Sequence, residues 1–281
     1  MKKLTLALFF IFAAHAQAKN ELPTKVVGLK TPESVVQAKD GSIYVSEINE
    51  FGKDGDGQIT KIDKNGKISI FARGLDDPKG MVMMNHQLFV TDKTKVLAID
   101  MDGTVHVYVD AKAFPKTPQF LNDIEADSFN NLYVSDSGDL KSGGAIYKID
   151  ENKTVSTVVD STNPAVLAPN GLCYEGRNSL LEVDFESGIL YRINLMTGTM
   201  AEVASGFGGG DGLVRTKTGK IYISDWKNGI INQVSASRAK LVNSGLTSSA
   251  DMTLSQNGQY LLVPLMKPGE LEFISIESAI K

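Results

Sequence analysis

A short strand-like tag recurs along this chain: apolar residues that in most copies end in Ser or Thr followed by an acid. Successive copies end 45, 44, 48, 41 and 39 residues apart, the last copy being degenerate. The copies are Ile43–Glu47, Leu88–Asp92, Leu132–Asp136, Leu180–Asp184, Ile221–Asp225 and Tyr260–Pro264. A period of 40 to 50 residues is typical of repeat architectures, among them propellers. The repeat therefore limits the chain to a fold built from similar units.

Each tag is followed by a second apolar run, and most units continue through a turn into a third. Lys64-Asn65-Gly66 and Met101-Asp102-Gly103 are strong hairpin signals between such runs. With a further short run before each tag, the unit is four short strands, which is the size of a propeller blade. We expect an all-β, six-bladed β-propeller formed by one domain, residues 19–281.

The two ends of the chain complement each other. The last unit lacks an outer strand, and residues 24–30 form a spare strand-like run before the first unit. We expect this N-terminal strand to complete the sixth blade, which would close the ring and remove an exposed sheet edge.

The first eighteen residues resemble an export signal. Lys2 and Lys3 precede an apolar run from Leu4 to Ala14, and Ala16-Gln17-Ala18 has the form of a cleavage site. The run is shorter than the roughly 20 residues that span a bilayer, and no cysteine nearby offers a lipid anchor. We expect cleavage near Ala18 and a periplasmic or secreted protein with no membrane anchor.

Charge and cysteine content exclude several functions. The chain has 29 basic and 33 acidic residues, a net charge of −4, and no long basic run. This argues against nucleic acid or an anionic membrane as the main partner. One cysteine excludes an intrachain disulfide framework and a cysteine-based zinc cluster. We expect a monomer whose partner is a small-molecule substrate.

The candidate site comes from the start of each innermost strand. Counting back fourteen residues from the end of each tag gives Glu33, Pro78, Asn122, Asn170, Asp211 and Ala250. Four of these six carry side-chain oxygens, and a closed ring would bring them to one axis. Two carboxylates and two amides suit Ca²⁺, Mg²⁺ or Mn²⁺, and Zn²⁺ is not excluded although its usual His and Cys ligands are missing. Turn formation alone would explain Asn170 and Asp211, but not Glu33.

Glu33, Asn122-Asp123, Asn170-Gly171 and Asp211-Gly212, in this order and with this blade count, resemble the senescence marker protein/gluconolactonase (regucalcin-like) family. The resemblance implies a six-bladed propeller with one axial divalent metal ion, held here by Glu33, Asn122, Asn170 and Asp211. It also implies lactone hydrolysis, with Asp211 as the general base. Ca²⁺ is the expected ion, and Mn²⁺, Mg²⁺ and Zn²⁺ are the alternatives.

Two departures from the family concern the substrate. Phe120 stands where sugar-lactone members often carry Arg, and the segment Thr31–Val35 lacks the Trp and Gly-Pro that tend to surround the family's Glu. We expect Phe120 and Asn122 to contact the substrate, which would be a less polar lactone or ester.

Two functions remain open. The first is a metal-dependent, lactonase-type carboxylic ester hydrolase that uses metal-activated water. The second is a non-catalytic propeller that binds a ligand or a protein, with a structural metal. His86 and His106 fall in strand-like runs and give a catalytic triad little support.

Three further features have simple expected roles. The calcium-loop-like segment Gly52–Gly57 is expected to be an exposed turn. The tag acids, such as Asp136, are expected to cap turns. Trp226 is expected either to line the substrate pocket or to be structural.

Overall fold

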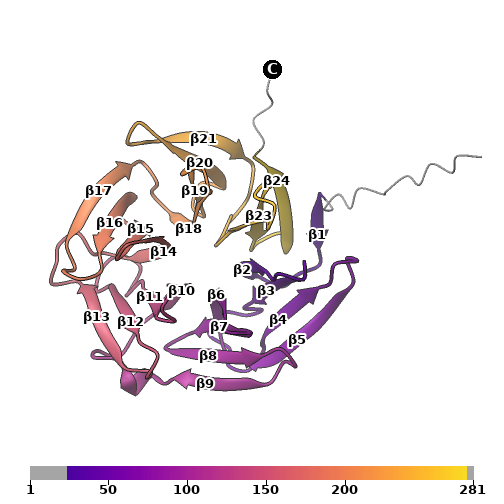
Figure 1. The fold of residues 1–281 in the computed structure, drawn as a ribbon. Coiled ribbons are helices and arrows are strands. Elements are labelled where there is room, and N and C mark those ends of the chain that lie inside the picture. Colours follow the sequence, from indigo (N-terminus) through magenta and orange to yellow (C-terminus); the bar gives the residue numbers. More distant parts are fainter. Residues whose placement is uncertain (1–23, 277–281) are drawn as a thin grey trace, which may run out of the picture.

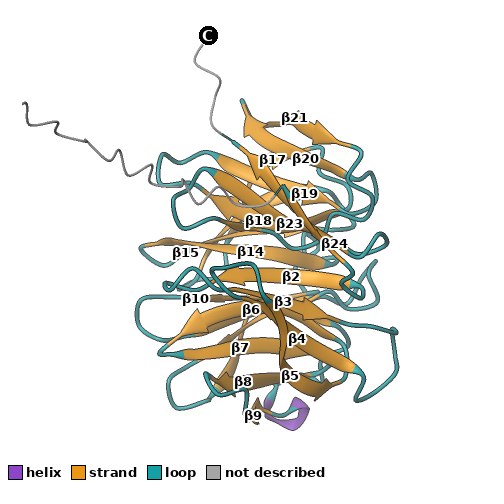
Figure 2. Cartoon of the chain, turned by 90° about the vertical axis from the view of Figure 1, so that its right-hand side faces the viewer, coloured by secondary structure: helices purple, strands orange, loops and turns teal. Residues whose placement is uncertain are grey.

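The computed structural model describes residues 24–276 and is all-β, as predicted. In this range the structure has 24 strands and one short 3₁₀ turn, η1 (Ala111–Ala113) (Figure 2). No helix in the described range is long and apolar enough to cross a membrane. The predicted signal peptide, residues 1–18, lies outside the described residues.

Three sheets of the first half are four-stranded antiparallel meanders. They are β2 (Pro32–Gln37), β3 (Ile43–Glu47), β4 (Gly57–Ile62), β5 (Ile68–Leu75); β6 (Pro78–Met84), β7 (Gln87–Asp92), β8 (Lys95–Asp100), β9 (Val105–Val109); and β10 (Leu121–Ala126), β11 (Leu132–Asp136), β12 (Ala145–Ile149), β13 (Val155–Asp160). Each tag is the second strand of its meander, as the repeat predicted.

An eight-stranded sheet follows, made of two such meanders. They are β14 (Pro169–Gly176), β15 (Ser179–Asp184), β16 (Ile189–Asn194), β17 (Met200–Ser205), and β18 (Gly210–Arg215), β19 (Ile221–Asp225), β20 (Ile230–Ser235), β21 (Arg238–Ser244). A single parallel residue pair, Ser205 with Arg238, joins their outer strands.

The last sheet combines the two ends of the described chain. It contains β22 (Thr253–Leu254), β23 (Tyr260–Leu265), β24 (Glu270–Ser275) and β1 (Lys25–Val27). β1 pairs with β24, with Val26 opposite Leu271. The spare N-terminal strand therefore supplies the outer strand that the last unit lacks.

Apolar cores lie between neighbouring sheets, which are arranged around a common centre (Figure 1). One core joins the first sheet to the last, where Val35 and Val45 pack in one cluster with Leu262 and Leu271. Burial of each such side chain stabilises the fold by about 1.5–3 kcal/mol. The alternating apolar residues of the tags feed these cores, and β2, β6, β10, β14 and β18 lie nearest the centre.

The hydroxyls of the tags have a structural role. Ser46, Ser135 and Ser224 each accept a hydrogen bond from a backbone N–H of the adjacent innermost strand, at 2.9, 2.9 and 2.7 Å. Ser224 also donates to the backbone oxygen of Ala250, at the start of the next unit, at 2.8 Å. The fourth tag has Val183 at this position and lacks this bridge. The hydroxyl that recurs in the tags therefore links strands rather than performing chemistry.

The acids of the tags cap turns, as expected. Asp136 accepts hydrogen bonds from the backbone N–H groups of Gln119, Phe120 and Gly138, at 2.8–3.3 Å. Asp184 does the same for the turns on either side of its strand. These carboxylates fix the loops that lead into the innermost strands.

Candidate functional site

A cavity of about 300 Å³ opens where the innermost strands begin. The structure brings all four predicted ligands and Phe120 to this cavity. Five buried residues, which we call the floor, come from the innermost strands: Glu33, Lys79, Asn122, Asn170 and Asp211. The remaining lining residues, which we call the walls, are apolar: Ile48, Phe51, Phe120, Leu140, Phe185, Trp226 and Met266.

The floor residues occupy equivalent positions. Each of the five strands starts opposite the last residue of its tag, and a bulge follows at once. The opposed pairs are Pro32 and Glu47, Pro78 and Asp92, Leu121 and Asp136, Pro169 and Asp184, and Gly210 and Asp225. The floor residue is the first bulged residue in every case. A repeated bulge therefore aims five side chains into one cavity.

The interpretation of the second unit was wrong by one residue. The count of fourteen placed Pro78 at the site, whereas the observed register places Lys79 there. The hairpin between β6 and β7 is one residue shorter than its counterparts, because Asn85 and His86 form a two-residue turn with φ of 50° and 60° and no second bulge precedes it. The β14–β15 hairpin also has a two-residue turn, but a second bulge between Tyr174 and Gly176 restores the usual length. The lysine after Pro78 was the available signal, but only the register identifies it as the equivalent of Glu33.

Two glycines next to the floor allow the innermost strands to approach each other. A Cβ on Gly171 would lie 2.1 Å from the backbone oxygen of Asp211, and one on Gly212 would lie 2.3 Å from the backbone nitrogen of Met252. Both contacts are with backbone, which cannot rotate away. The Asn-Gly and Asp-Gly pairs of the sequence therefore bring neighbouring strands together at the site.

Three floor oxygens are buried without a hydrogen-bond partner: Glu33 Oε2, Asn170 Oδ1 and Asp211 Oδ1. Asn122 donates a hydrogen bond from Nδ2 to Ser137 Oγ at 3.0 Å, and this bond fixes the orientation of its amide group. Buried polar atoms are normally paired. Three orphaned oxygens in one cavity are a hard donor set that fits a cation such as Ca²⁺.

The donor chemistry is mixed rather than fully acidic. No group of three or more His, Cys, Asp or Glu in residues 24–276 is arranged to hold a metal ion. The floor offers two carboxylates, Glu33 and Asp211, with two amides. A cation here would depend on the amide oxygens as well as on charge.

The floor carboxyls are electrostatically strained. Burial, followed by the negative charges of Asp211 and Asp251, raises the pKa of Glu33 well above its usual range, and Lys79 opposes this. Burial and Asp251 raise the pKa of Asp211 in the same way, while a hydrogen bond with Asn170 opposes it. A positive charge among these groups would relieve the strain.

Asp251 was missed by the sequence analysis, which stopped at Ala250. It accepts a hydrogen bond from Ser34 Oγ, and burial raises its pKa to about 7. It does not line the cavity, but its charge affects both Glu33 and Asp211. Asp251 therefore raises the pKa values of two floor carboxyls without lining the cavity itself.

Lys79 is the cation of the floor. Its side chain is almost completely buried, and Nζ lies 4.2 Å from the ring centre of Phe120. Nζ donates to the backbone oxygen of Asp77 at 3.2 Å. Burial lowers the pKa of Lys79, and the charges of Glu33, Asp77 and Asp92 oppose this.

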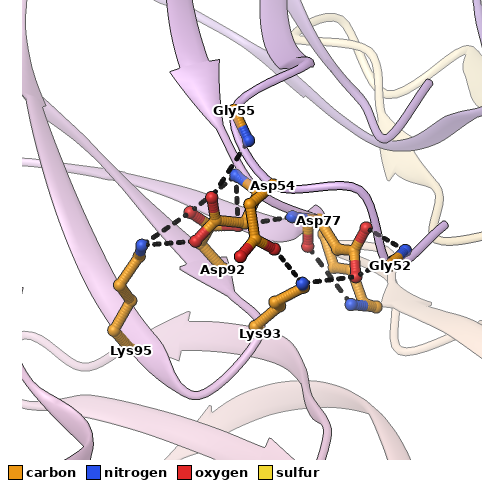
Figure 3. A network of polar contacts seen from close by, with 9 residues as sticks. Gly52, Asp54, Gly55, Asp77, Asp92, Lys93 and Lys95 are labelled. Atoms are coloured by element: carbon orange, nitrogen blue, oxygen red, sulfur yellow. Dashed lines mark hydrogen bonds and ion pairs between the residues drawn. The ribbon is translucent and has the colours of Figure 1, made fainter. Parts of the chain in front are cut away.

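A polar network holds the turn that precedes Lys79 (Figure 3). Asp92 accepts hydrogen bonds from the backbone N–H groups of Asp76 and Asp77, and it is paired with Lys95. The side chain of Asp77 accepts from the backbone of Gly52 at 3.0 Å. The segment Gly52–Gly57 is otherwise a largely exposed turn, as expected. Its contact with the Asp77 side chain helps to fix the backbone oxygen of Asp77, which accepts the hydrogen bond from Lys79 Nζ.

The walls are largely aromatic. Trp226, the single tryptophan of the chain, lines the cavity and donates from Nε1 to Met266 Sδ at 2.9 Å. Trp226 therefore has the first of its two expected roles, which is to line the pocket. Phe51, with 54% of its surface exposed, lies at the mouth. Such walls suit a ligand with an apolar body.

The histidines do not line the cavity. His86 lies in the β6–β7 turn and not within a strand, which corrects the expectation for it. His106 lies on β9, where its Nε2 is 2.9 Å from Asp100 Oδ2 at the surface. Neither can take part in chemistry at the floor.

No known sequence family and no curated protein matches the chain. Solved structures match its fold. A gluconolactonase from Xanthomonas campestris has 13% identity and a TM-score of 0.68, covering 87% of this chain and 86% of that one. A luciferin-regenerating enzyme has 14% identity and a TM-score of 0.69, covering 86% and 85%. Virginiamycin B lyase from Staphylococcus aureus has 14% identity and a TM-score of 0.63, covering 90% and 98%.

These similarities are structural. At such identities they show a shared fold, and the fold is shared by a lactonase and by a lyase. Function therefore has to be argued from the cavity. The chain has the all-β fold of gluconolactonase-like, propeller-type proteins.

Proposed function

We propose that this protein is a metal-dependent hydrolase that opens a lactone, or a related ester, of largely apolar structure. The observation that supports this proposal most directly is the convergence of three unpaired oxygens, from Glu33, Asn170 and Asp211, on a cavity with apolar walls. The residues come from three separate innermost strands and share one position in the repeat. The gluconolactonase-like fold of the neighbours supports the same reaction class.

Glu33, Asn122, Asn170 and Asp211 would hold one divalent cation, Ca²⁺ in the first instance and Mn²⁺, Mg²⁺ or Zn²⁺ as alternatives. When bound, such an ion polarises the substrate carbonyl and stabilises the charge that develops on its oxygen.

The protein's own groups would carry the remaining steps. Asp211 accepts a proton from the attacking water, whose oxygen adds to the acyl carbon. The ring C–O bond then breaks, and the leaving oxygen takes up the proton that Asp211 received from the water. Phe120 and Asn122 contact the substrate, and the apolar walls hold its body and exclude water from the floor.

We also propose that the chain forms six blades, with the eight-stranded sheet counted as two. Its two meanders share one residue pair, Ser205 with Arg238. The packing of the first sheet against the last, together with the β1–β24 pairing, supports closure of the ring.

A lactone panel tests the function. Aliphatic and sugar lactones are offered to the mature protein after EDTA, and with Ca²⁺, Mn²⁺, Mg²⁺ or Zn²⁺ restored. We expect metal-restored turnover that favours aliphatic lactones. Asp211→Ala should abolish it, whereas Glu186→Ala, at an exposed position near the mouth, should not. Tight metal binding without turnover on any lactone would support the non-catalytic binding propeller instead.

A further inference from the structure

Lys79 is a buried cation whose hydrogen-bonding capacity is not used up by the protein. An ammonium group has three donors, and Nζ donates to one acceptor, the backbone oxygen of Asp77. Among the described residues, no carboxylate lies within ion-pair distance of Nζ. Lysine is almost never fully buried unless it is paired. The remaining donors therefore call for an acceptor that the protein does not supply.

The place of Lys79 shows where that acceptor would come from. Lys79 is the first bulged residue of β6, so it stands in the same position as Glu33 and Asp211, on the floor of the cavity. Phe120 lies against Nζ and shields it from solvent. An acceptor that reaches Nζ must therefore be part of the molecule that fills the cavity.

The charge of the floor limits what that molecule can carry. Among the side chains that line the cavity, two carboxylates, Glu33 and Asp211, oppose one ammonium, so a bound divalent cation would bring these lining groups to a net charge of about +1. One negative charge on the ligand balances this. A dianion such as a phosphate monoester would exceed the balance, and no arginine lines the cavity.

We infer that Lys79 binds a carboxylate of the ligand, so that the cavity selects apolar molecules carrying a single carboxylate. The inference deepens the proposed function and rests on it for the nature of the ligand, since opening an apolar lactone yields an apolar hydroxy acid. Lys79 then binds the acid group while the aromatic walls hold the chain.

A binding experiment tests this without requiring turnover. Hexanoate and its neutral analogue hexanamide are titrated into the full protein, with saturating Ca²⁺ and with EDTA. Trp226 fluorescence reports binding, because the only tryptophan lines the cavity. In the Ca²⁺-loaded protein we expect hexanoate to bind at least about tenfold more tightly than hexanamide.

Variants assign the preference to Lys79. In Lys79→Met the ratio of the two affinities should fall at least about fivefold while hexanamide still binds, and Lys79→Arg should retain the preference. Lys227→Met is the matched control, since this lysine lies 4.3 Å over the ring of Phe185, another wall residue, with 41% of its side chain exposed. If Lys79→Met does not fold, Lys79→Gln takes its place.

The outcomes separate the two proposals. An affinity ratio that Lys79→Met leaves unchanged, or no preference in the native protein, overturns the role of Lys79 even if lactones are hydrolysed. A preference that depends on Lys79, in a protein that hydrolyses no lactone, supports the carboxylate site and overturns the hydrolase.

Discussion

Glu33 and Glu182 are both buried glutamates with side-chain oxygens that lack a partner, but they lie in different surroundings. Glu33 faces a cavity with two other orphaned oxygens and a lysine. Glu182 lies in the middle of β15, opposite Leu172 and Tyr191, at a tag position that is Val or Ile in the four other clear copies of the tag. An unpaired buried acid therefore indicates a binding site only where several polar groups converge.

The largest expected effect is on metal affinity. Glu33→Gln should weaken Ca²⁺ binding at least about 100-fold, because it removes one of two floor carboxylates. Glu182→Gln is the matched control and should leave the affinity unchanged. Calorimetric titration of Ca²⁺ into each protein measures both. Equal affinities for the native and Glu33→Gln proteins would remove Glu33 from the ligand set.

The close approach of backbones at the floor gives the next effect. Gly212→Ala should destabilise the fold by about 2 kcal/mol, since its Cβ would meet the backbone of Met252. Gly208→Ala is the control, because a Cβ there has open space and needs no special backbone conformation. Urea unfolding compares the two. Equal stability would mean that the strands can separate at low cost.

The buried carboxyl of Glu182 should lower the free energy of unfolding by an amount that depends on pH. Burial, helped by the charge of Asp184, raises the pKa of Glu182 well above its usual range. A raised pKa in the folded state means that stability is highest below the unfolded-state pKa and is lost as the pH rises through the folded-state value. Glu182→Val should therefore stabilise the protein by about 1.5 kcal/mol at pH 8, and by much less at pH 4.

Denaturant unfolding at the two pH values measures this gain. Glu175→Val is the contrasting variant, because Glu175 is paired with Arg192 and its pKa is lowered. A gain for Glu182→Val that is equal at both pH values would show that shape, and not charge, is the source.

The smallest effect concerns the hydroxyl bridges. Ser135→Ala removes the acceptor for the backbone N–H of Asp123 and should cost about 1 kcal/mol. Ser142→Ala, at an exposed turn, should cost close to nothing. Thermal unfolding of the two variants makes the comparison, and equal melting temperatures would mean that water replaces the bridge.

The sequence by itself determined the strand order, the tags and four of the five floor residues. These follow from local rules: alternation of apolar residues, turn chemistry, and a constant distance between the start of an innermost strand and the end of its tag. The pairing of β1 with β24 was also predictable, because the last unit visibly lacked a strand.

The tertiary structure decided what depends on register and on partners. Lys79 was missed because the β6–β7 hairpin combines a two-residue turn with no second bulge, and the resulting shift of one residue moves a different side chain into the cavity. The linking role of the tag hydroxyls and the isolation of Glu182 depend on which side chains face each other across paired strands. The influence of Asp251 depends on its contact with Ser34, at the other end of the described chain. These contacts exist only after the strands have paired and the sheets have packed, so the spacing of residues in the sequence does not specify them.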